Sequence, residues 1–213
     1  MRLHSSSSSP NGRRTEAVVR HLGLAIEIVQ VDLKAGAQRT PQHLALNPNG
    51  RITVLEDDGL RLWESNAIIQ YLADKAGDAV LFPRDPVRRA DVVRWQFWAS
   101  EHFNRALTTL AWELRGKPAL GLGEPDCHLV AIAQGDFAAY APVLEAHLAG
   151  RRYLLGDDMT LADYVVGTYE PYRQALPVDW AAHPNLSAYF DRLAASPHWL
   201  PKASSQASAL ETA

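Results

Sequence analysis

Hydrophobic and polar positions divide the chain into a first part with mixed periodicity and a second part with helical periodicity. Residues 13–22 carry apolar side chains at helical spacing, whereas residues 24–31 alternate and then become mainly apolar, as in a half-covered strand. Two short apolar runs, 52–55 and 60–63, flank an Asp-Gly step and predict an antiparallel hairpin, after which a helix ends at Gly77. With a short strand at the start, the predicted order is strand, helix, strand, then strand, strand, helix.

A proline-containing segment separates these two parts of the chain. Residues 80–86 contain two prolines, so we predict that they link an α/β domain at 1–79 to an all-helical domain at 87–213. The predicted fold class is therefore an α/β domain followed by an all-α domain. A chain of 213 residues has room for two such domains of roughly 100 residues each.

The helical part begins with two long helices, predicted over 88–115 and 126–149 from their apolar periodicity. Residues 160–163, Thr-Leu-Ala-Asp, fit a capping box, in which the Thr oxygen accepts from the third amide and the Asp returns the bond. A last helix is expected at 185–194, after a proline. The small and polar residues at 203–213 predict a frayed end.

Composition and charge limit the possible partners. With 47% hydrophobic and 21% charged residues the chain resembles an average globular protein. The net charge of −3, from 21 basic and 24 acidic side chains, provides no positive potential that would attract a nucleic acid or an anionic membrane surface. No apolar run approaches the roughly 20 residues that span a bilayer, and serines stand where a signal peptide has its apolar core. We therefore expect a cytoplasmic protein without nucleic-acid or membrane partners.

The chain has a single cysteine, Cys127. One cysteine excludes an internal disulfide, a Cys-x-x-Cys redox pair and a thiolate zinc cage, so no metal is predicted. A lone nucleophile stays possible, although we expect Cys127 to be a packed and inert residue of the helical part. Any thiol chemistry would then depend on a thiol from outside the chain.

Two consecutive segments resemble a known family. Asn-Pro-Asn-Gly-Arg-Ile-Thr-Val-Leu-Glu-Asp at 47–57 and Leu-Arg-Leu-Trp-Glu-Ser-Asn-Ala-Ile-Ile-Gln-Tyr-Leu at 60–72 resemble the glutathione-binding signature of the cytosolic glutathione transferase superfamily. Residues 156–163 resemble the capping motif of its helical domain. The resemblance covers nearly the whole chain and implies a thioredoxin-like N-terminal domain, an all-helical C-terminal domain, glutathione as co-substrate and a homodimer.

A finer resemblance involves fewer residues. Ser-Pro-Asn-Gly-Arg-Arg at 9–14, with Val-Asp-Leu at 31–33 and Gln38, is similar to the bacterial nu-class members, which are glutathione-dependent disulfide-bond reductases with a Thr/Ser-Pro-Asn-Gly motif. This similarity implies disulfide reduction as an activity beside conjugation. Because the chain has one cysteine, a reductase of this kind would use glutathione sulfurs and not a protein pair.

The chemistry expected at Ser9 and Asn11 is stabilisation of a thiolate. A free thiol with a pKa near 8.5 is only a few per cent ionised at neutral pH, and lowering that pKa by two units requires about 2.7 kcal/mol. A hydroxyl, an amide and unpaired backbone N–H groups at the start of a helix can supply it beside the positive end of the helix dipole. Taken alone, the serines at 5–9 are also consistent with a flexible polar N-terminus.

Glu64 and Ser65 open a helix directly after a strand. First-turn amides and the Ser65 hydroxyl can bind the γ-glutamyl carboxylate of glutathione, while Glu64 can pair with its ammonium group. The alternative is that these residues only cap the helix. The family resemblance further implies that the Ile52 backbone meets the cysteinyl part of glutathione, and that Gln38 and Arg51 face its glycine carboxylate.

Thr53 departs from the family pattern, which has a cis-proline at this position. The cis bond of the family turns the preceding amide and carbonyl toward the cysteinyl backbone. A cis bond before a residue other than proline costs roughly 3–4 kcal/mol, so Thr53 either adopts it at that cost or takes a trans geometry that misplaces Ile52.

The long helix after the linker carries aromatic residues at helical spacing. Trp98, His102 and Arg105 are predicted to share a face that could line a pocket for an apolar second substrate. Aromatic residues at this spacing more often belong to the core, and His102 would then be a satisfied polar group. The competing hypotheses are an enzyme that activates glutathione and a non-catalytic module that uses the fold for binding or dimerisation.

Overall fold

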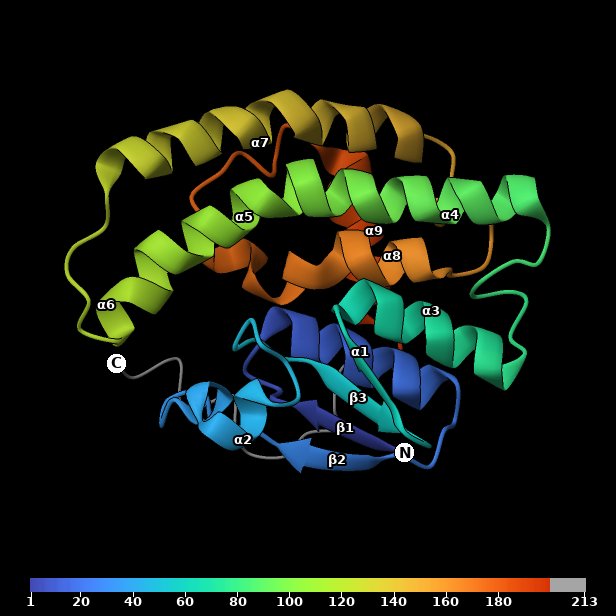
Figure 1. Ribbon diagram of the computed structural model, residues 1–213. Helices are drawn as coiled ribbons and strands as arrows, with labels where there is room; N and C mark the ends of the chain where they lie inside the picture. Colours follow the sequence, from blue (N-terminus) through green and yellow to red (C-terminus); the bar gives the residue numbers. More distant parts are fainter. Residues whose placement is uncertain (200–213) are drawn as a thin grey trace.

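A four-stranded mixed sheet lies at one side of the computed structural model, which describes residues 1–199 (Figure 1). In the order β2-β1-β3-β4, β1 is parallel to β2 and antiparallel to β3, and β3 is antiparallel to β4. This topology confirms the predicted strand-helix-strand and strand-strand-helix units, and the hairpin register pairs Asp57 with Leu60. The strands are β1 (Arg2–Ser5), β2 (Glu27–Gln30), β3 (Val54–Asp57) and β4 (Leu60–Trp63).

The helices of the first part begin and end on the residues that their caps require. Helix α1 begins at Pro10, earlier than the predicted residue 13, because Ser9 occupies the N-cap and the fixed φ of proline suits the first turn. Gly77 closes α3 with a left-handed φ of 72°, as expected. The elements are α1 (Pro10–His21), the 3-10 helix η1 (Ala37–Arg39), α2 (Pro41–Leu44) and α3 (Ser65–Ala76).

The predicted long helix over 88–115 is a continuous helical run interrupted twice by π-helical segments, η2 and η3. In a π-helix the i→i+5 bonds widen the turn, so side chains after the segment are rotated relative to those before it. The elements of the helical part are α4 (Pro86–Trp98), η2 (Ala99–Phe103), α5 (Asn104–Ala111), η3 (Trp112–Gly116), α6 (Lys117–Ala119), α7 (Cys127–Leu148), α8 (Leu161–Val166), the 3-10 helix η4 (Gly167–Ala175) and α9 (Pro184–Ala194).

The predicted capping box at the start of α8 is present. One oxygen of Asp163 accepts from the Thr160 amide at 2.8 Å, and the other accepts from the Leu154 amide and the Tyr189 hydroxyl, each at 3.0 Å. Asp163 is fully buried, and burial raises the pKa of its carboxyl group. This single side chain therefore joins α8, α9 and the loop after α7.

Helices α1 and α3 lie between the sheet and the helical part, and α7 crosses above the run from α4 to α5 (Figure 1). The main core is continuous across this boundary, and the amide of Leu161 donates to the carbonyl of Leu81 at 3.0 Å. A smaller core packs on the sheet. The residues that the first part and the linker contribute to the main core are Ala17, Val18, Ile69, Ala73, Leu81 and Phe82.

Cys127 is exposed, so the prediction of a packed thiol is wrong. The residue begins α7, whose first amides are capped by the side chain of Asp126 through bonds to His128 and Leu129. Helical periodicity counts Cys127 as an apolar position, but the first turn of α7 is largely exposed.

Three further predictions concern what the chain lacks or where it ends. Among residues 1–199, no helix has the length and hydrophobicity to cross a bilayer. Within that same range, no three His, Cys, Asp or Glu side chains gather in a way that could hold a metal ion. The frayed end predicted at 203–213 lies outside the described residues.

Candidate functional site

A cavity of about 230 Å³ opens where α1, α3 and the loop before β3 meet. The sequence predicts a binding role for every residue of its lining except Asn47. First-turn residues of two helices, α1 and α3, line this space, and helix N-termini favour anions. The lining consists of Asn11, Asn47, Arg51, Ile52, Thr53, Glu64 and Ser65.

The N-terminal end of α1 forms one wall of the cavity. Asn11 is exposed in the first turn, and Ser9 is a half-buried N-cap whose side chain makes no capping bond, so its hydroxyl is free for another partner. Ser9 itself is not part of the lining. The alternative of a flexible serine segment is wrong, because Ser5 belongs to β1 and donates to Glu16 at 2.7 Å, and Ser6 is buried.

The loop before β3 is held by two side chains that the sequence analysis does not identify. The carbonyl of Arg51 accepts hydrogen bonds from His43 Nε2 and Asn47 Nδ2, both at 2.9 Å. The peptide bond between Ile52 and Thr53 is cis, which is one of the two geometries expected at this position. The turn signal at 47–50 marks Asn47 as special, whereas nothing near His43 indicates its contact with the loop.

Glu64 and Ser65 form the opposite wall at the start of α3. Glu64 has a φ of 73°, in the left-handed region that residues other than glycine rarely adopt, and such backbone conformations cluster at functional sites. Its side chain makes no capping bond, which argues against the helix-cap alternative for Glu64. Ser65, in the first turn of α3, is buried and lines the cavity.

Gln38 does not line the cavity. The residue is half-buried in η1, and a Cβ at Gly50 would lie 3.4 Å from its backbone carbonyl. The side-chain oxygen of Gln38 is buried and has no hydrogen-bond partner within residues 1–199. The backbone of Gln38 therefore lies beside Gly50, the residue before Arg51.

Arg14 is a site residue that the sequence analysis misses. Arg14 is 5% exposed and donates to Asn11 Oδ1 at 3.1 Å and to Ser65 Oγ at 2.5 Å, so it joins the two walls of the cavity. Burial lowers the pKa of Arg14 to about 10, against the opposing influence of Tyr169 and Glu64. The only signal in the sequence is the Arg-Arg pair at 13–14.

The three residues predicted for a second-substrate pocket do not reach this cavity. Trp98 and His102 pack against Tyr140 of α7, with ring centroids 6.1 and 4.9 Å away. Both side chains are half-buried, and Trp98 packs against the main core. Arg105 is exposed and follows the π-helical segment η2, which changes the helical phase after Trp98.

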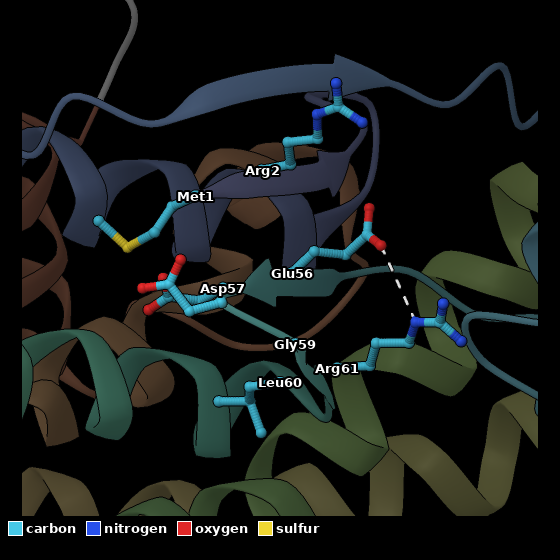
Figure 2. A pocket seen from close by; sticks show the side chains of 8 residues that line it. Met1, Arg2, Glu56, Asp57, Gly59, Leu60 and Arg61 are labelled. Atoms are coloured by element: carbon cyan, nitrogen blue, oxygen red, sulfur yellow. Dashed lines mark ion pairs between the residues drawn. The ribbon is translucent and has the colours of Figure 1, made fainter.

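A larger hollow of about 490 Å³ lies at the turn between β3 and β4. Figure 2 shows its lining, including Arg2, Asp57 and the ion pair of 3.9 Å between Glu56 and Arg61. None of the predicted binding residues belongs to it. Size alone therefore does not identify the functional site of this protein.

Comparison with known families shows to which family the chain belongs. Residues 1–74 match the family "Glutathione S-transferase, N-terminal domain", and residues 103–197 match "Glutathione S-transferase, C-terminal domain". The chain belongs to the glutathione S-transferase family. The first match contains the whole cavity lining, from Asn11 to Ser65.

Individual glutathione S-transferases are similar over nearly the full length. Glutathione S-transferase 3 of Zea mays is 36% identical over 201 residues, which cover 92% of this chain and 90% of the maize protein. The crystal structure of glutathione transferase F7 from Populus trichocarpa has a TM-score of 0.85 at 28% identity, with 93% and 95% of the two chains covered. A theta class glutathione S-transferase from Xanthomonas axonopodis pv. citri, with glutathione bound, has a TM-score of 0.82 at 31% identity, covering 93% and 94%.

Proposed function

We propose that this glutathione S-transferase binds glutathione in the cavity between α1 and α3 and conjugates its thiolate to small electrophiles. The observation that carries the proposal is the convergence of Asn11 and Ser65, each in the first turn of its helix, on one cavity. Glutathione carries a γ-glutamyl carboxylate and an ionisable thiol, and helix N-termini favour both anions.

The two walls would bind different parts of glutathione. The Ser65 hydroxyl and the first amides of α3 would hold the γ-glutamyl carboxylate, with Glu64 on the ammonium group. The backbone of Ile52, next to Thr53, would meet the cysteinyl part. Gln38 and Arg51, at the rim, would face the glycine carboxylate.

The thiol would then lie over the N-terminus of α1. Ser9 and Asn11 would donate hydrogen bonds to the thiolate and so lower the pKa of the bound thiol. Support comes from the uncapped Ser9 hydroxyl and from the position of Asn11 in the lining. The bonds stabilise an anion that is already favoured by the helix dipole, so no general base is required.

The second substrate is proposed only as a small electrophile. In the helical part, the Tyr172 hydroxyl of η4 donates to the Ser8 carbonyl at 3.5 Å, which brings an aromatic side chain to the loop before Ser9. An electrophile between this tyrosine and the thiolate would be within reach of the sulfur. The earlier assignment of this pocket to Trp98, His102 and Arg105 has no support from the cavity lining.

Disulfide reduction is a second candidate, supported by the likeness of Ser-Pro-Asn-Gly at 9–12 to nu-class members. Conjugation to an aryl halide and reduction of a small mixed disulfide, assayed side by side with glutathione, separate the two activities. Faster conjugation supports the first proposal and faster reduction the second. Retention on immobilised glutathione without either activity would favour a non-catalytic binding module.

The assembly and division of the chain are also proposals. We propose a homodimer, as is typical of the family, and the division into a domain at 1–79, a linker at 80–86 and a helical domain at 87–213. Exposed apolar side chains that would support dimerisation lie on β4 and on α4, the start of the long helix after the linker, and within residues 1–199 none of the large ones lies on α3. No nucleic acid or membrane is proposed as a partner, and the cytoplasm remains the proposed location.

A further inference from the structure

Arg14 connects three elements through its guanidinium group. Nη2 donates to Asn11 Oδ1 at 3.1 Å and to Ser65 Oγ at 2.5 Å, and Nη1 donates to Thr168 Oγ1 at 2.9 Å. Asn11 lies in α1, Ser65 in α3 and Thr168 in η4 of the helical part. One buried side chain therefore holds both walls of the cavity and ties them to the other domain.

The bond to Thr168 fixes the orientation of Arg14 through the helical part of the chain. Thr168 Oγ1 lies 2.7 Å from the carbonyl of Val165 and 3.2 Å from that of Tyr164. A hydroxyl has one proton, so it donates to one of these carbonyls and accepts from Arg14 through a lone pair. The guanidinium thus has a defined orientation before any ligand binds.

The charge of Arg14 lacks a close counter-ion in the protein. Within residues 1–199, no carboxylate lies at ion-pairing distance from it, and its Nε has no hydrogen-bond partner. Arginine keeps its charge at neutral pH, and a buried charge is costly unless an opposite charge offsets it. The Glu64 carboxylate, which lines the cavity, acts on Arg14 from beyond ion-pairing distance. A bound anion would bring a closer opposite charge to the guanidinium.

The bonds from Arg14 also decide which atoms the two walls present. A guanidinium only donates, so it occupies the acceptor oxygen of Asn11 and a lone pair of Ser65. The amide protons of Asn11 and the hydroxyl proton of Ser65 remain for a ligand. Both side chains line the cavity, where a thiolate and a carboxylate accept such protons.

We propose that Arg14 is the positioning residue of the glutathione site: it fixes Asn11 and Ser65 as donors and supplies the positive charge beneath them. The inference rests on the proposed function. It assigns to Arg14 an effect on both the affinity for glutathione and the ionisation of its thiol, through two side chains that touch different parts of the ligand.

The test is a titration of bound glutathione, followed by the ultraviolet absorbance of the thiolate, in the full-length protein and in Arg14→Lys. Lysine keeps the positive charge but lacks the planar fork that bonds Asn11 and Ser65 together. We expect Arg14→Lys to lower the thiolate fraction at neutral pH and the affinity for glutathione by about tenfold each. In the Asn11→Ala background the same substitution should change the thiolate fraction much less.

Arg20→Lys is the matched control. Arg20 lies in the same helix and is half-buried, but it donates to the carbonyl of His198 at 2.9 Å and does not line the cavity. Its substitution should leave the thiolate titration unchanged. If Arg14→Lys and the unaltered protein give the same titration, the inference about Arg14 is wrong but the proposed function stands. If the unaltered protein shows no thiolate band, the proposed function is contradicted as well.

Asn11→Asp tests, with Arg14 left in place, whether the guanidinium of Arg14 lacks a counter-ion. The new carboxylate would stand where the amide oxygen accepts from Arg14, so it would pair with the buried guanidinium and remove the amide protons. We expect a higher thermal midpoint together with loss of the thiolate band. A lower midpoint than that of the unaltered protein would show that Arg14 is already neutralised, and would contradict the inference.

Discussion

The imidazole rings of His21 and His198 are stacked, with centroids 4.6 Å apart and planes inclined by 21°. His21 ends α1 and its Nδ1 lies 2.7 Å from the hydroxyl of Tyr164 in α8, while His198 belongs to the segment after α9. The pair thus joins the first part of the chain to the end of the helical part. Two protonated rings at this distance would repel each other.

Folding stability should therefore fall in mild acid. Burial lowers the pKa of His21, as does the neighbouring His198, while Asp78 opposes the shift. Because the unfolded chain takes up the proton first, the contribution of His21 is complete above about pH 6.5 and is lost as the pH falls below that value. We expect the difference in thermal midpoint between about pH 8 and about pH 5 to be smaller in His21→Gln than in the unaltered protein. An equal difference would assign the acid sensitivity to other groups.

Ser65→Ala should weaken glutathione binding by about 1–3 kcal/mol, the usual cost of losing a hydrogen bond to a charged group. The variant should fold, because alanine fits the space of serine and suits the first turn of α3. Isothermal calorimetry measures the dissociation constant, and circular dichroism checks the fold. An unchanged constant in a folded variant would remove Ser65 from the site.

Asn11→Ala should cost more activity than Ser9→Ala. Asn11 lines the cavity and is held by Arg14, whereas Ser9 lies outside the lining and has no bond that orients its hydroxyl. Loss of one preorganised donor to a developing or bound anion costs on the order of 2.7–4 kcal/mol. The pKa of the bound thiol, measured from thiolate absorbance in both variants, should rise more for Asn11→Ala. The reverse order would transfer the main role to Ser9.

Gly12→Ala should destabilise the protein although alanine normally favours a helix by about 1 kcal/mol over glycine. A Cβ at Gly12 would lie 2.2 Å from the Ser6 carbonyl oxygen and 2.9 Å from Ser5 Oγ, so the loop before Ser9 would have to move. Overpacking of this kind costs about 1–3 kcal/mol. Gly135→Ala in α7, where no atom lies within 4 Å of the added carbon, is the control and should be neutral or stabilising in urea unfolding.

The protein should sediment as a dimer at micromolar concentration. Phe97 of α4 is 65% exposed and Trp63 of β4 is 39% exposed, which is unusual for large apolar side chains of a monomer. Phe97→Ser should shift the equilibrium toward the monomer, whereas Leu129→Ser on α7 should not. A mass near 23.5 kDa for the unaltered chain would contradict the prediction.

Features that depend on neighbouring residues were predictable from the sequence. The Asp-Gly hairpin, the cap at Gly77 and the capping box at the start of α8 each follow from a few adjacent side chains, and all are present. The residues of the cavity were also predictable, since most of them belong to two continuous signature segments.

Features that depend on contacts between residues far apart in the chain could not be predicted from the sequence. The role of Arg14 depends on hydrogen bonds to Ser65 and Thr168, which lie 51 and 154 positions away in the chain. No local sequence pattern predicts such contacts. The predicted shared face of Trp98, His102 and Arg105 assumed a regular helix, and the π-helical segment η2 breaks that assumption. Cys127 looked apolar by type, but its place at the first turn of α7 leaves it in water.

The continuous core has a consequence for attempts to divide the protein. Leu81 and Phe82, which lie in the predicted linker, are buried in the same cluster as Val18 and Ile69 of the first part and Leu107 of α5. If the chain were divided in this segment, each fragment would expose apolar surface to water. The hydrogen bond from the Leu161 amide to the Leu81 carbonyl would also be lost. The two halves therefore share one hydrophobic cluster. A chimera that exchanges one half must also supply the matching surface of the other half.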